Sequence, residues 1–223
     1  MFKFLFMTHS EEDYIKAIYH LGVLNNSTVA TNAIAEQMDT KPSSVTDMIR
    51  KLSEKGFVSY KKYQGVSLTD LGTQKALTIV RKHRLWEVFL VDKLDFSWDE
   101  VHEIAEQLEH IKSEKLTDSL DKHLGYPKFD PHGDPIPSKA GVFTNTTKKL
   151  LNEVAINNSG ICVGVKDSSA PFLKFLDKHE IALGDYITVL DKEDFDGSLQ
   201  IKINEKIILI SHQIASNLYV KST

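Results

Sequence analysis

Apolar residues recur with the period of an α-helix through the first 55 residues. Tyr14, Ile15 and Ile18 follow Ser10 and a group of acidic residues, an order typical of a helix N-terminus. Two further periodic segments come next, and the second begins at Pro42, which suits the first turn of a helix. The pattern therefore predicts three helices, at residues 10–22, 31–38 and 42–55.

Two short segments with the composition of β-strands follow the third helix. They cover residues 57–61 and 66–69, and Gly65 lies in the turn that joins them. Three helices followed by a hairpin are the elements of a winged helix-turn-helix, in which the third helix is the recognition helix and the hairpin is the wing. The order of elements predicts this module for the first third of the chain.

Two longer amphipathic segments fill the middle of the chain. The first begins at Asp70 and reaches about residue 91, and a capping box from Ser97 to Glu100 opens the second, which reaches about residue 124. Residues 126–141 then contain four of the six prolines. This composition predicts an ordered-to-flexible linker at a domain boundary.

The last third of the chain is β-rich. A short helix is expected near residues 146–152, and residues 171–178 form the only helical segment within the β-rich part. Spaced short strands of this kind predict a small barrel. The fold class is therefore mainly α with a small β domain. The predicted strands cover residues 161–165, 186–190, 199–203, 206–210 and 217–220.

Composition excludes several classes of protein. A hydrophobic content of 41% and a charged content of 26% are ordinary for a globular chain and exclude disorder. No segment has about 20 uncharged apolar residues, so no membrane span is expected. Cys162 is the only cysteine, which excludes an intramolecular disulfide and favours a cytoplasmic location. Residues 1–6 carry no pattern, so either Met1 or Met7 can be the start.

The charge is unevenly spread. Residues 1–82 hold 11 basic and 8 acidic residues, a net +3, whereas residues 83–140 hold 7 and 13, a net −6. The remaining residues hold 9 and 10, so the three parts sum to the net charge of −4. A basic first third suggests an anionic partner, and the acidic, histidine-containing middle suggests a bound cation.

The acidic middle contains a candidate metal cluster. If residues 102–110 are helical, His102, Glu106, Glu109 and His110 fall within about 100° of arc, apart from the apolar residues. On the preceding helix, residues 83 and 87 are four positions apart and share a face. Imidazoles and carboxylates on adjacent helices suit a first-row divalent cation. A solvated acidic face with incidental histidines fits the same spacing.

Basic residues cluster around the predicted recognition helix. Residues 41–62 contain six lysines and arginines against two acidic residues, a surplus that fits contacts with phosphates. Each lysine taken singly is also compatible with an ordinary solvated surface. The lysines at 61 and 62 lie in the wing, which is expected to touch backbone more than bases. The candidate DNA-binding residues are Lys41, Ser43, Ser44, Thr46, Asp47, Arg50, Lys51, Lys61 and Lys62.

Five segments together carry a family resemblance. They are Asp13-Tyr14-Ile15, the segment from Lys41 to Thr46, Arg81-Lys82-His83-Arg84-Leu85, the segment from His102 to His110, and the segment from Pro131 to Pro137. In this order and spacing they resemble the diphtheria-toxin-repressor family of metal-dependent transcriptional regulators. The resemblance covers essentially the whole chain and is to the long members of the family.

The resemblance implies three domains and two metal sites. The domains would be a winged helix-turn-helix DNA-binding domain at 1–72, a helical dimerisation and metal-binding domain with its Pro-rich linker at 73–140, and an SH3-like (FeoA-like) domain at 141–223. The family's primary metal site matches Asp13, Glu106, Glu109 and His110, and its ancillary site lies near His83, Glu87 and His102.

The same resemblance favours manganese. Iron-type members carry a methionine and a cysteine where this chain has Asp13 and Glu106, and hard carboxylate oxygens favour Mn(II), with Fe(II) as the alternative. Some manganese members carry a glutamate where this chain has Lys16, so a closely spaced two-manganese site is doubtful. The barrel's ligands match Asp167, Ser168 or Ser169 only loosely, and a capped turn is the favoured interpretation there.

The expected function is a manganese-dependent repressor of metal-ion uptake genes. It would bind palindromic double-stranded DNA as a homodimer, with Mn(II) as corepressor and with up to two sites per chain. No enzymatic activity and no membrane partner are expected. The alternatives are an iron-dependent repressor of the same family, a winged-helix regulator with a non-metal effector or a protein partner, and a metal-dependent hydrolase that uses the same histidines and glutamates.

Overall fold

The computed structural model describes residues 7–25, 28–61, 64–145 and 147–222. The chain forms two compact units. The first comprises residues 1–83, 106–114 and 137–142, and the second comprises residues 84–105, 115–136 and 143–223. The division passes through the helices α4 (Asp70–Leu94) and α5 (Val101–Leu108), so each of them contributes to both units. The expected division into three domains stays a prediction.

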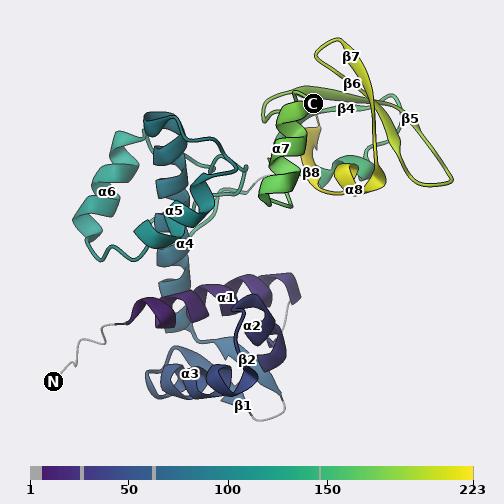
Figure 1. Cartoon of the computed structure of the whole chain (residues 1–223). Coiled ribbons are helices and arrows are strands. Elements are labelled where there is room, and N and C mark those ends of the chain that lie inside the picture. The colour runs from purple at the N-terminus through teal and green to yellow at the C-terminus, as the bar shows by residue number, and fades with distance from the viewer. Residues whose placement is uncertain (1–6, 26–27, 62–63, 146, 223) are drawn as a thin grey trace. The chain divides into compact units, whose positions relative to one another are not determined.

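The first unit begins with three helices and a hairpin (Figure 1). Helix α1 contacts α2, α3 and β2, and α3 also contacts β1. Ile15, Ile34 and Val45 are fully buried where these elements meet. The strands pair antiparallel from Val58 opposite Leu68 onwards. The elements are α1 (His9–Asn25), α2 (Thr31–Gln37), α3 (Pro42–Glu54), β1 (Val58–Lys61) and β2 (Gly65–Leu68).

The start of α1 differs from the prediction. Ser10 was expected to cap this helix, but the helix begins one residue earlier, at His9. The backbone N–H of Thr8 donates to Glu11 Oε2 over 2.9 Å, and the N–H of Glu11 is 3.3 Å from the Thr8 hydroxyl. Thr8 and Glu11 therefore exchange the capping hydrogen bonds at the start of α1, in place of Ser10 and Asp13.

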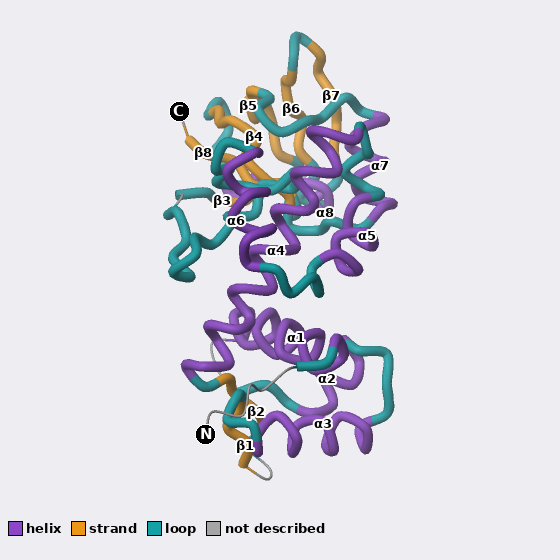
Figure 2. Tube along the Cα trace, turned by 90° about the vertical axis from the view of Figure 1, so that its left-hand side faces the viewer, coloured by secondary structure: helices purple, strands orange, loops and turns teal. Residues whose placement is uncertain are grey.

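The second unit contains residues 84–94 of α4, nearly all of the helix α6 (Glu114–His123) and a six-stranded antiparallel sheet (Figure 2). The sheet order is β3-β8-β4-β5-β6-β7, and irregularities interrupt the β4–β8 and β5–β6 pairings. Helix α7 (Ala170–Lys178) contributes Leu173 and Leu176 to the core of the sheet domain, together with Cys162. The strands are β3 (Lys149–Leu150), β4 (Ser159–Val165), β5 (Tyr186–Lys192), β6 (Leu199–Ile203), β7 (Lys206–Ile210) and β8 (Leu218–Ser222).

The single helix expected at 97–124 is wrong, because α5 ends at Leu108 and α6 begins at Glu114. The buried ammonium group of Lys82, on α4, donates to the backbone carbonyls of Glu109 and Ile111. These carbonyls therefore accept hydrogen bonds from a side chain, as carbonyls at a helix C-terminus do, and the helix ends before them. The sequence pattern does not contain this long-range partner.

Two predictions in the β-rich part were also wrong. The helix expected near residues 146–152 is replaced by β3, which pairs with β8, and by a single 3₁₀ turn at Leu151–Glu153; residue 146 itself lies outside the described residues. A further short helix, α8 (His212–Ala215), was missed, although the Ser211 hydroxyl caps it by accepting from the N–H of Ile214 over 3.3 Å. One helical turn is too short to show a period of 3.6 residues.

The proline-rich segment is packed within the structure. Asp130, His132 and Ile136 are all buried, and Phe129 forms a β-bridge with Pro135. The expected linker is therefore ordered over these residues. Among the described residues, no helix is both long enough and apolar enough to span a membrane.

Candidate metal centres and DNA-binding surface

The first unit brings together three of the expected metal ligands. Asp13 lies on α1, and Glu109 and His110 lie in the turn that follows α5. One ligand atom from each of the three lies within 4.8 Å of the others. The side chain of Glu109 is 1% exposed, whereas that of Asp13 is 41% exposed. The group is therefore anchored in the interior and reachable from solvent.

Buried partners orient His110 towards Asp13. Its Nδ1 lies 2.8 Å from Glu12 Oε2, and its Nε2 lies 3.0 Å from Asp13 Oδ1. Burial alone would raise the pKa of Glu12, but hydrogen bonds from His110 and Lys75 hold it below its usual range. Because the ionised Glu12 can only accept, Nδ1 of a neutral His110 donates and Nε2 carries the lone pair. His9 stacks on the same ring at 4.3 Å between centroids.

Glu109 is held as a carboxylate. Burial tends to raise its pKa, but the hydrogen bond from His83 and the charge of Lys16 lower it overall. Its Oε2 lies 2.6 Å from His83 Nδ1 and 2.6 Å from Lys16 Nζ. Asp13 has a raised pKa because of burial, to which the negative charges of Glu109 and Glu106 add. A bound cation would relieve this repulsion.

Glu106 stands apart from this group. Its side chain is 54% exposed, and its Oε1 lies 3.4 Å from Lys16 Nζ. The cluster of Asp13, Glu109 and His110 does not include it. Its expected role as a ligand stays a prediction.

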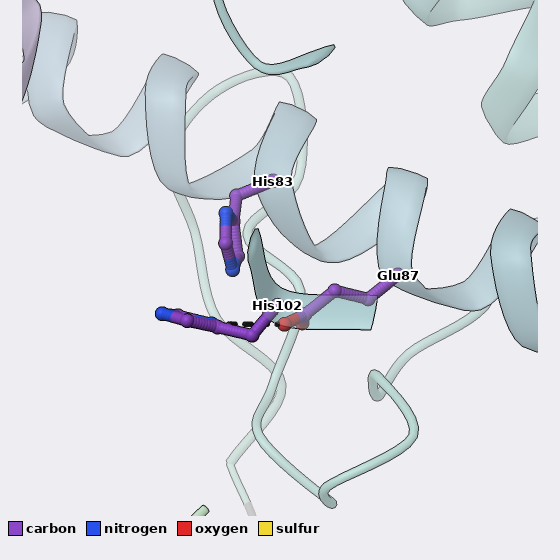
Figure 3. Close-up of side chains that lie close together, drawn as sticks. All are labelled: His83, Glu87 and His102. Atoms are coloured by element: carbon purple, nitrogen blue, oxygen red, sulfur yellow. Dashed lines mark hydrogen bonds and ion pairs between the residues drawn. The ribbon is translucent and has the colours of Figure 1, made fainter. Parts of the chain in front are cut away.

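The expected ancillary residues also lie close together (Figure 3). His83 and Glu87 are one turn apart on α4, and Nδ1 of His102, on α5, lies 3.4 Å from Glu87 Oε1. Because Nδ1 of His83 faces the ionised Glu109, its other nitrogen carries the lone pair in the neutral ring. Glu87 is buried, while the side chain of His102 is 53% exposed.

A further group, which the sequence analysis missed, lies in the second unit. Ligand atoms of Glu87, Asp130 and His132 lie within 4.8 Å of one another, and all three residues are buried. His132 Nε2 lies 2.8 Å from the backbone carbonyl of Trp98, which can only accept, so in the neutral ring Nε2 donates and Nδ1 carries the lone pair. That Nδ1 faces Glu87 Oε1 at 3.8 Å. In this tautomer two acceptors face each other in the interior, and a cation between them would satisfy both.

The surroundings of Asp130 support this interpretation. Burial, together with the nearby charges of Glu87 and Asp134, raises the pKa of Asp130 to about 7. Its Oδ1 accepts the backbone N–H groups of His132 and Asp134, and its Oδ2 lies 3.3 Å from Arg84 Nε. The Asp-x-His spacing was a usable signal in the sequence, but the surrounding prolines favoured a linker and concealed it.

The barrel residues that match the family's metal ligands only loosely, at positions 167–169, form a turn. Asp167 Oδ1 accepts the N–H of Ser169 over 2.8 Å, and Ser169 is the N-cap residue of α7. This agrees with the capped turn favoured from the sequence, and Asp167 does not belong to any of the groups of His, Cys, Asp and Glu that could hold a metal among the described residues.

The three groups suit a hard or borderline divalent cation. Every donor in them is a carboxylate oxygen or an imidazole nitrogen. This set fits Mn(II), Fe(II) or Zn(II), and the absence of thiolate disfavours softer ions. Cys162 does not contribute, because it is buried in the sheet core, where burial raises the pKa of its thiol to about 11.

Helix α3 carries most of the candidate DNA-binding residues. Val45, Ile49 and Leu52 form its buried face. On other faces, Arg50 and Asp47 form an exposed ion pair at 3.8 Å. Thr46 is half-buried, and its hydroxyl donates to the Pro42 carbonyl. Lys62, like Tyr63 beside it, lies outside the described residues. The other candidates are exposed: Lys41, Ser43, Ser44, Lys51 and Lys61.

An ion pair connects α1 with the end of α3. Lys55 Nζ lies 2.6 Å from Glu11 Oε1 and 2.8 Å from its Oε2, and Glu11 is buried. Three consecutive acidic residues therefore have distinct sets of partners: Glu11 pairs with Lys55, Glu12 pairs with Lys75 and His110, and Asp13 shares His110 with Glu12 and lies close to Glu109.

Three family models match consecutive parts of the chain. They are the N-terminal DNA-binding domain of iron-dependent repressors at residues 6–66, the metal-binding and dimerisation domain of the same repressors at 69–138, and the FeoA domain at 149–222. The transcriptional regulator MntR of Listeria welshimeri is 33% identical over 147 residues, which are 66% of this chain and 99% of that protein. The chain belongs to the iron-dependent repressor family.

Other comparisons extend this assignment. A solved structure described as a manganese-dependent transcriptional repressor in complex with manganese aligns over 96% of this chain and all of that chain, with a TM-score of 0.84 and 33% identity. A probable metal transport system membrane protein of Chlamydia trachomatis is 46% identical over 88 residues, which are 40% of this chain but only 19% of that protein. The expected family is thus confirmed, and with it the arrangement of a DNA-binding domain, a helical metal-binding and dimerisation domain and an SH3-like domain.

Membership defines the general function of the chain. It is a metal-dependent transcriptional repressor of this family, whose regulators bind DNA and contain a dimerisation domain.

Proposed function

We propose that the chain is a manganese-responsive repressor that binds a palindromic operator as a homodimer and controls metal-ion uptake genes. One observation carries the coupling of metal to DNA: Asp13, on the first helix of the DNA-binding module, meets Glu109 and His110 from a distant part of the chain. The residues that bind the ion therefore include one that moves with the DNA-binding helices.

The coupling would proceed through α1. When bound, the ion supplies the positive charge that Asp13 and Glu109 lack, and this favours the arrangement in which their carboxylates converge. Helix α1 packs against α2 and α3, and the Glu11–Lys55 ion pair ties it to the end of α3. Fixing α1 would therefore fix the recognition helix, and metal would raise DNA affinity by the free-energy difference between the two arrangements.

The buried group in the second unit would be a second metal site. Glu87, Asp130 and His132 would hold the ion, with His102 and His83 beside Glu87. Because Asp130 and His132 belong to the segment that packs against β4, a cation there would stabilise the attachment of the sheet domain. This assigns the barrel a stabilising role and adds no catalytic activity.

Manganese is favoured over iron by the donors. Asp13 supplies a hard oxygen, and no sulfur ligand belongs to any described group. The relatives named MntR and the manganese-bound structural neighbour agree with this choice, whereas the family models are named for iron. Because Zn(II) binds most such sites more tightly in vitro, buffered metal concentrations are needed to compare the ions.

The test is selection from a random duplex DNA library by metal-stripped protein. Parallel selections at fixed salt would contain Mn(II), Fe(II) under anaerobic conditions, or chelator. We expect one palindrome to be enriched with Mn(II) and lost with chelator. Equal enrichment with and without chelator would remove the corepressor role, and enrichment with Fe(II) alone would assign the chain to iron.

Two variants sharpen this test. Asp13→Asn should lose metal-dependent enrichment while keeping the fold, because it removes the charged ligand and preserves size. Asp118→Asn, an exposed position on α6, is the matched control and should behave like the parent. Full manganese-dependent binding by the Asp13 variant would contradict the coupling through α1.

A further inference from the structure

The ammonium group of Lys16 lies among side chains that would otherwise be metal ligands. It follows Asp13 by one helical turn on α1. Its Nζ lies 2.6 Å from Glu109 Oε2, 3.4 Å from Glu106 Oε1 and 3.2 Å from His83 Nδ1. The side chain is 11% exposed, so the position of its charge is set by the protein interior.

These contacts are those of a cation with its ligands. Two carboxylate oxygens, from Glu109 and Glu106, lie within 3.4 Å of Nζ, and carboxylate oxygens are donors that a divalent ion takes. A protonated lysine has three N–H donors and no lone pair, so it satisfies such oxygens without coordinating a metal. Lys16 therefore occupies the position of a cation next to the Asp13 group.

His83 lies beside Lys16 but is not one of these ligands. Its Nδ1 lies 2.6 Å from Glu109 Oε2 and 3.2 Å from Lys16 Nζ. One nitrogen cannot donate to Glu109 and accept from Lys16 at the same time. Since Glu109 is held ionised, Nδ1 donates to it, and the approach of Lys16 is directed at the carboxylates.

We propose that Lys16 is a resident cation that takes the place of a second divalent ion, so that the Asp13 group binds one ion with moderate affinity. This inference rests on the proposed function, since it presumes that Asp13, Glu109 and His110 hold a metal. The positive charge near that ion lowers its affinity by repulsion, and the ammonium group fills the space where a neighbouring ion would bind. Lys16 thus determines how many ions bind and how tightly.

Two substitutions separate these effects. Lys16→Met removes the charge and keeps an unbranched apolar stem, so the single ion should bind roughly tenfold more tightly. Lys16→Glu replaces the cation by a carboxylate, so that Glu106, Glu109 and residue 16 offer oxygens for another ion. This variant should bind one Mn(II) more than the parent, at the distance of about 3.5–4 Å typical of two-metal sites.

The experiment uses the full-length, metal-stripped chain. Mn(II) is counted by native mass spectrometry, its affinity is measured by competition with a fluorescent chelator, and magnetic coupling between ions is followed by electron paramagnetic resonance. All variants are also made in a Glu87→Gln background, which weakens the other two groups. Lys93→Glu, an exposed position on α4, is the control for the change of charge.

The outcomes are distinct. A coupled ion pair in Lys16→Glu, with single, uncoupled ions in the parent and in Lys93→Glu, supports the proposal. A coupled pair in the parent, or an unchanged count in a folded Lys16→Glu variant, overturns it. If Lys16→Glu fails to fold, as judged by circular dichroism, Lys16→Met decides, and unchanged or weaker affinity overturns the proposal. If the parent itself binds no Mn(II), the proposed function fails first.

Discussion

At the scale of single residues, Glu12 connects α1 with His110 in the first unit. It is buried, pairs with Lys75 at 3.0 Å and faces Nδ1 of His110. A carboxylate behind a metal-binding histidine fixes which ring nitrogen carries the lone pair. Under the proposed function, Glu12 is a positioning residue whose effect on the metal passes through His110.

We therefore predict that Glu12→Gln lowers Mn(II) affinity by about 10- to 100-fold. The glutamine amide can donate to Nδ1, which would place the proton on Nε2 and remove the lone pair that faces Asp13. Competition with a fluorescent chelator measures the affinity, and melting in chelator checks the fold. Glu36→Gln, an exposed position on α2, is the control. Unchanged affinity in a folded Glu12→Gln variant would show that His110 needs no such orientation.

Candidate ligands could be grouped from the sequence where they share one helix face or one family motif. Asp13, Glu109 and His110 were expected together and do lie together. Asp130 and His132 were missed because a proline-rich segment has no period from which burial can be inferred. The contacts of Lys16 and Lys82 were also beyond reach, since they depend on packing between distant segments.

At the scale of elements, the turn after β-bridge residue Phe129 depends on Gly133. Its φ is +82°, and a Cβ there would lie 2.1 Å from the backbone carbonyl oxygen of Val163. The carbonyl of His132 also accepts the N–H of Val165, so this turn and β4 are held backbone to backbone. A side chain at position 133 would force them apart.

We predict that Gly133→Ala lowers the free energy of unfolding by about 2–4 kcal/mol, through backbone strain and overpacking. Gly184→Ala is a matched control, because its φ is +94° but no atom lies within 4 Å of the place that a Cβ would take. It should lose about 1 kcal/mol from strain alone. Urea denaturation of the two variants measures the difference, and equal losses would show that the close approach to Val163 is unimportant.

The recognition helix gives a prediction of a different kind. The side chain of Arg50 is 68% exposed on α3 and forms an exposed ion pair with Asp47. If it contacts a phosphate, Arg50→Ala should weaken operator binding and reduce the slope of log affinity against log salt by about 1. Fluorescence anisotropy at several salt concentrations measures both. Lys178→Ala, exposed on α7, should leave the slope unchanged, and an unchanged slope for Arg50→Ala would place α3 away from the phosphates.

Among the elements, the three helices and the hairpin of the first unit were predicted to within a few residues, because each helix has a regular apolar face and α3 has Pro42 at its start and Gly56 just beyond its end. Gly22 was expected to end α1, but the helix continues to Asn25. The strands from β4 to β8 were also located. The break between α5 and α6 was not predicted, because the carbonyls at that break are satisfied by Lys82 from another helix. Local pattern therefore predicted the elements, and long-range polar contacts determined where one of them ends.

At the scale of the whole molecule, metal response requires that binding at one place alters DNA affinity at another. The Glu11–Lys55 ion pair is a polar contact between α1 and the end of α3. Burial tends to raise the pKa of Glu11, but the hydrogen bond from Lys55 keeps it low, so the pair stays charged. It is placed to transmit the position of α1 to the recognition helix.

The double variant Glu11→Gln, Lys55→Met should therefore uncouple the two functions. Mn(II) affinity is expected to change by less than about threefold, while the manganese-dependent gain in operator affinity falls by about tenfold. Chelator competition and anisotropy measure the two quantities on the same preparation. Removing both partners avoids leaving one buried charge unpaired. A full manganese-dependent gain in this variant would exclude the ion pair from the coupling.

The position of Lys16 also affects how fast the metal ion is released. A site whose carboxylates already hold an ammonium group binds a divalent ion less tightly, and for a given association rate weaker binding means faster release. A repressor built in this way returns to its metal-free state soon after the free ion becomes scarce. The lysine would then shorten the delay between metal starvation and renewed transcription, and a chain with a glutamate in its place would respond more slowly.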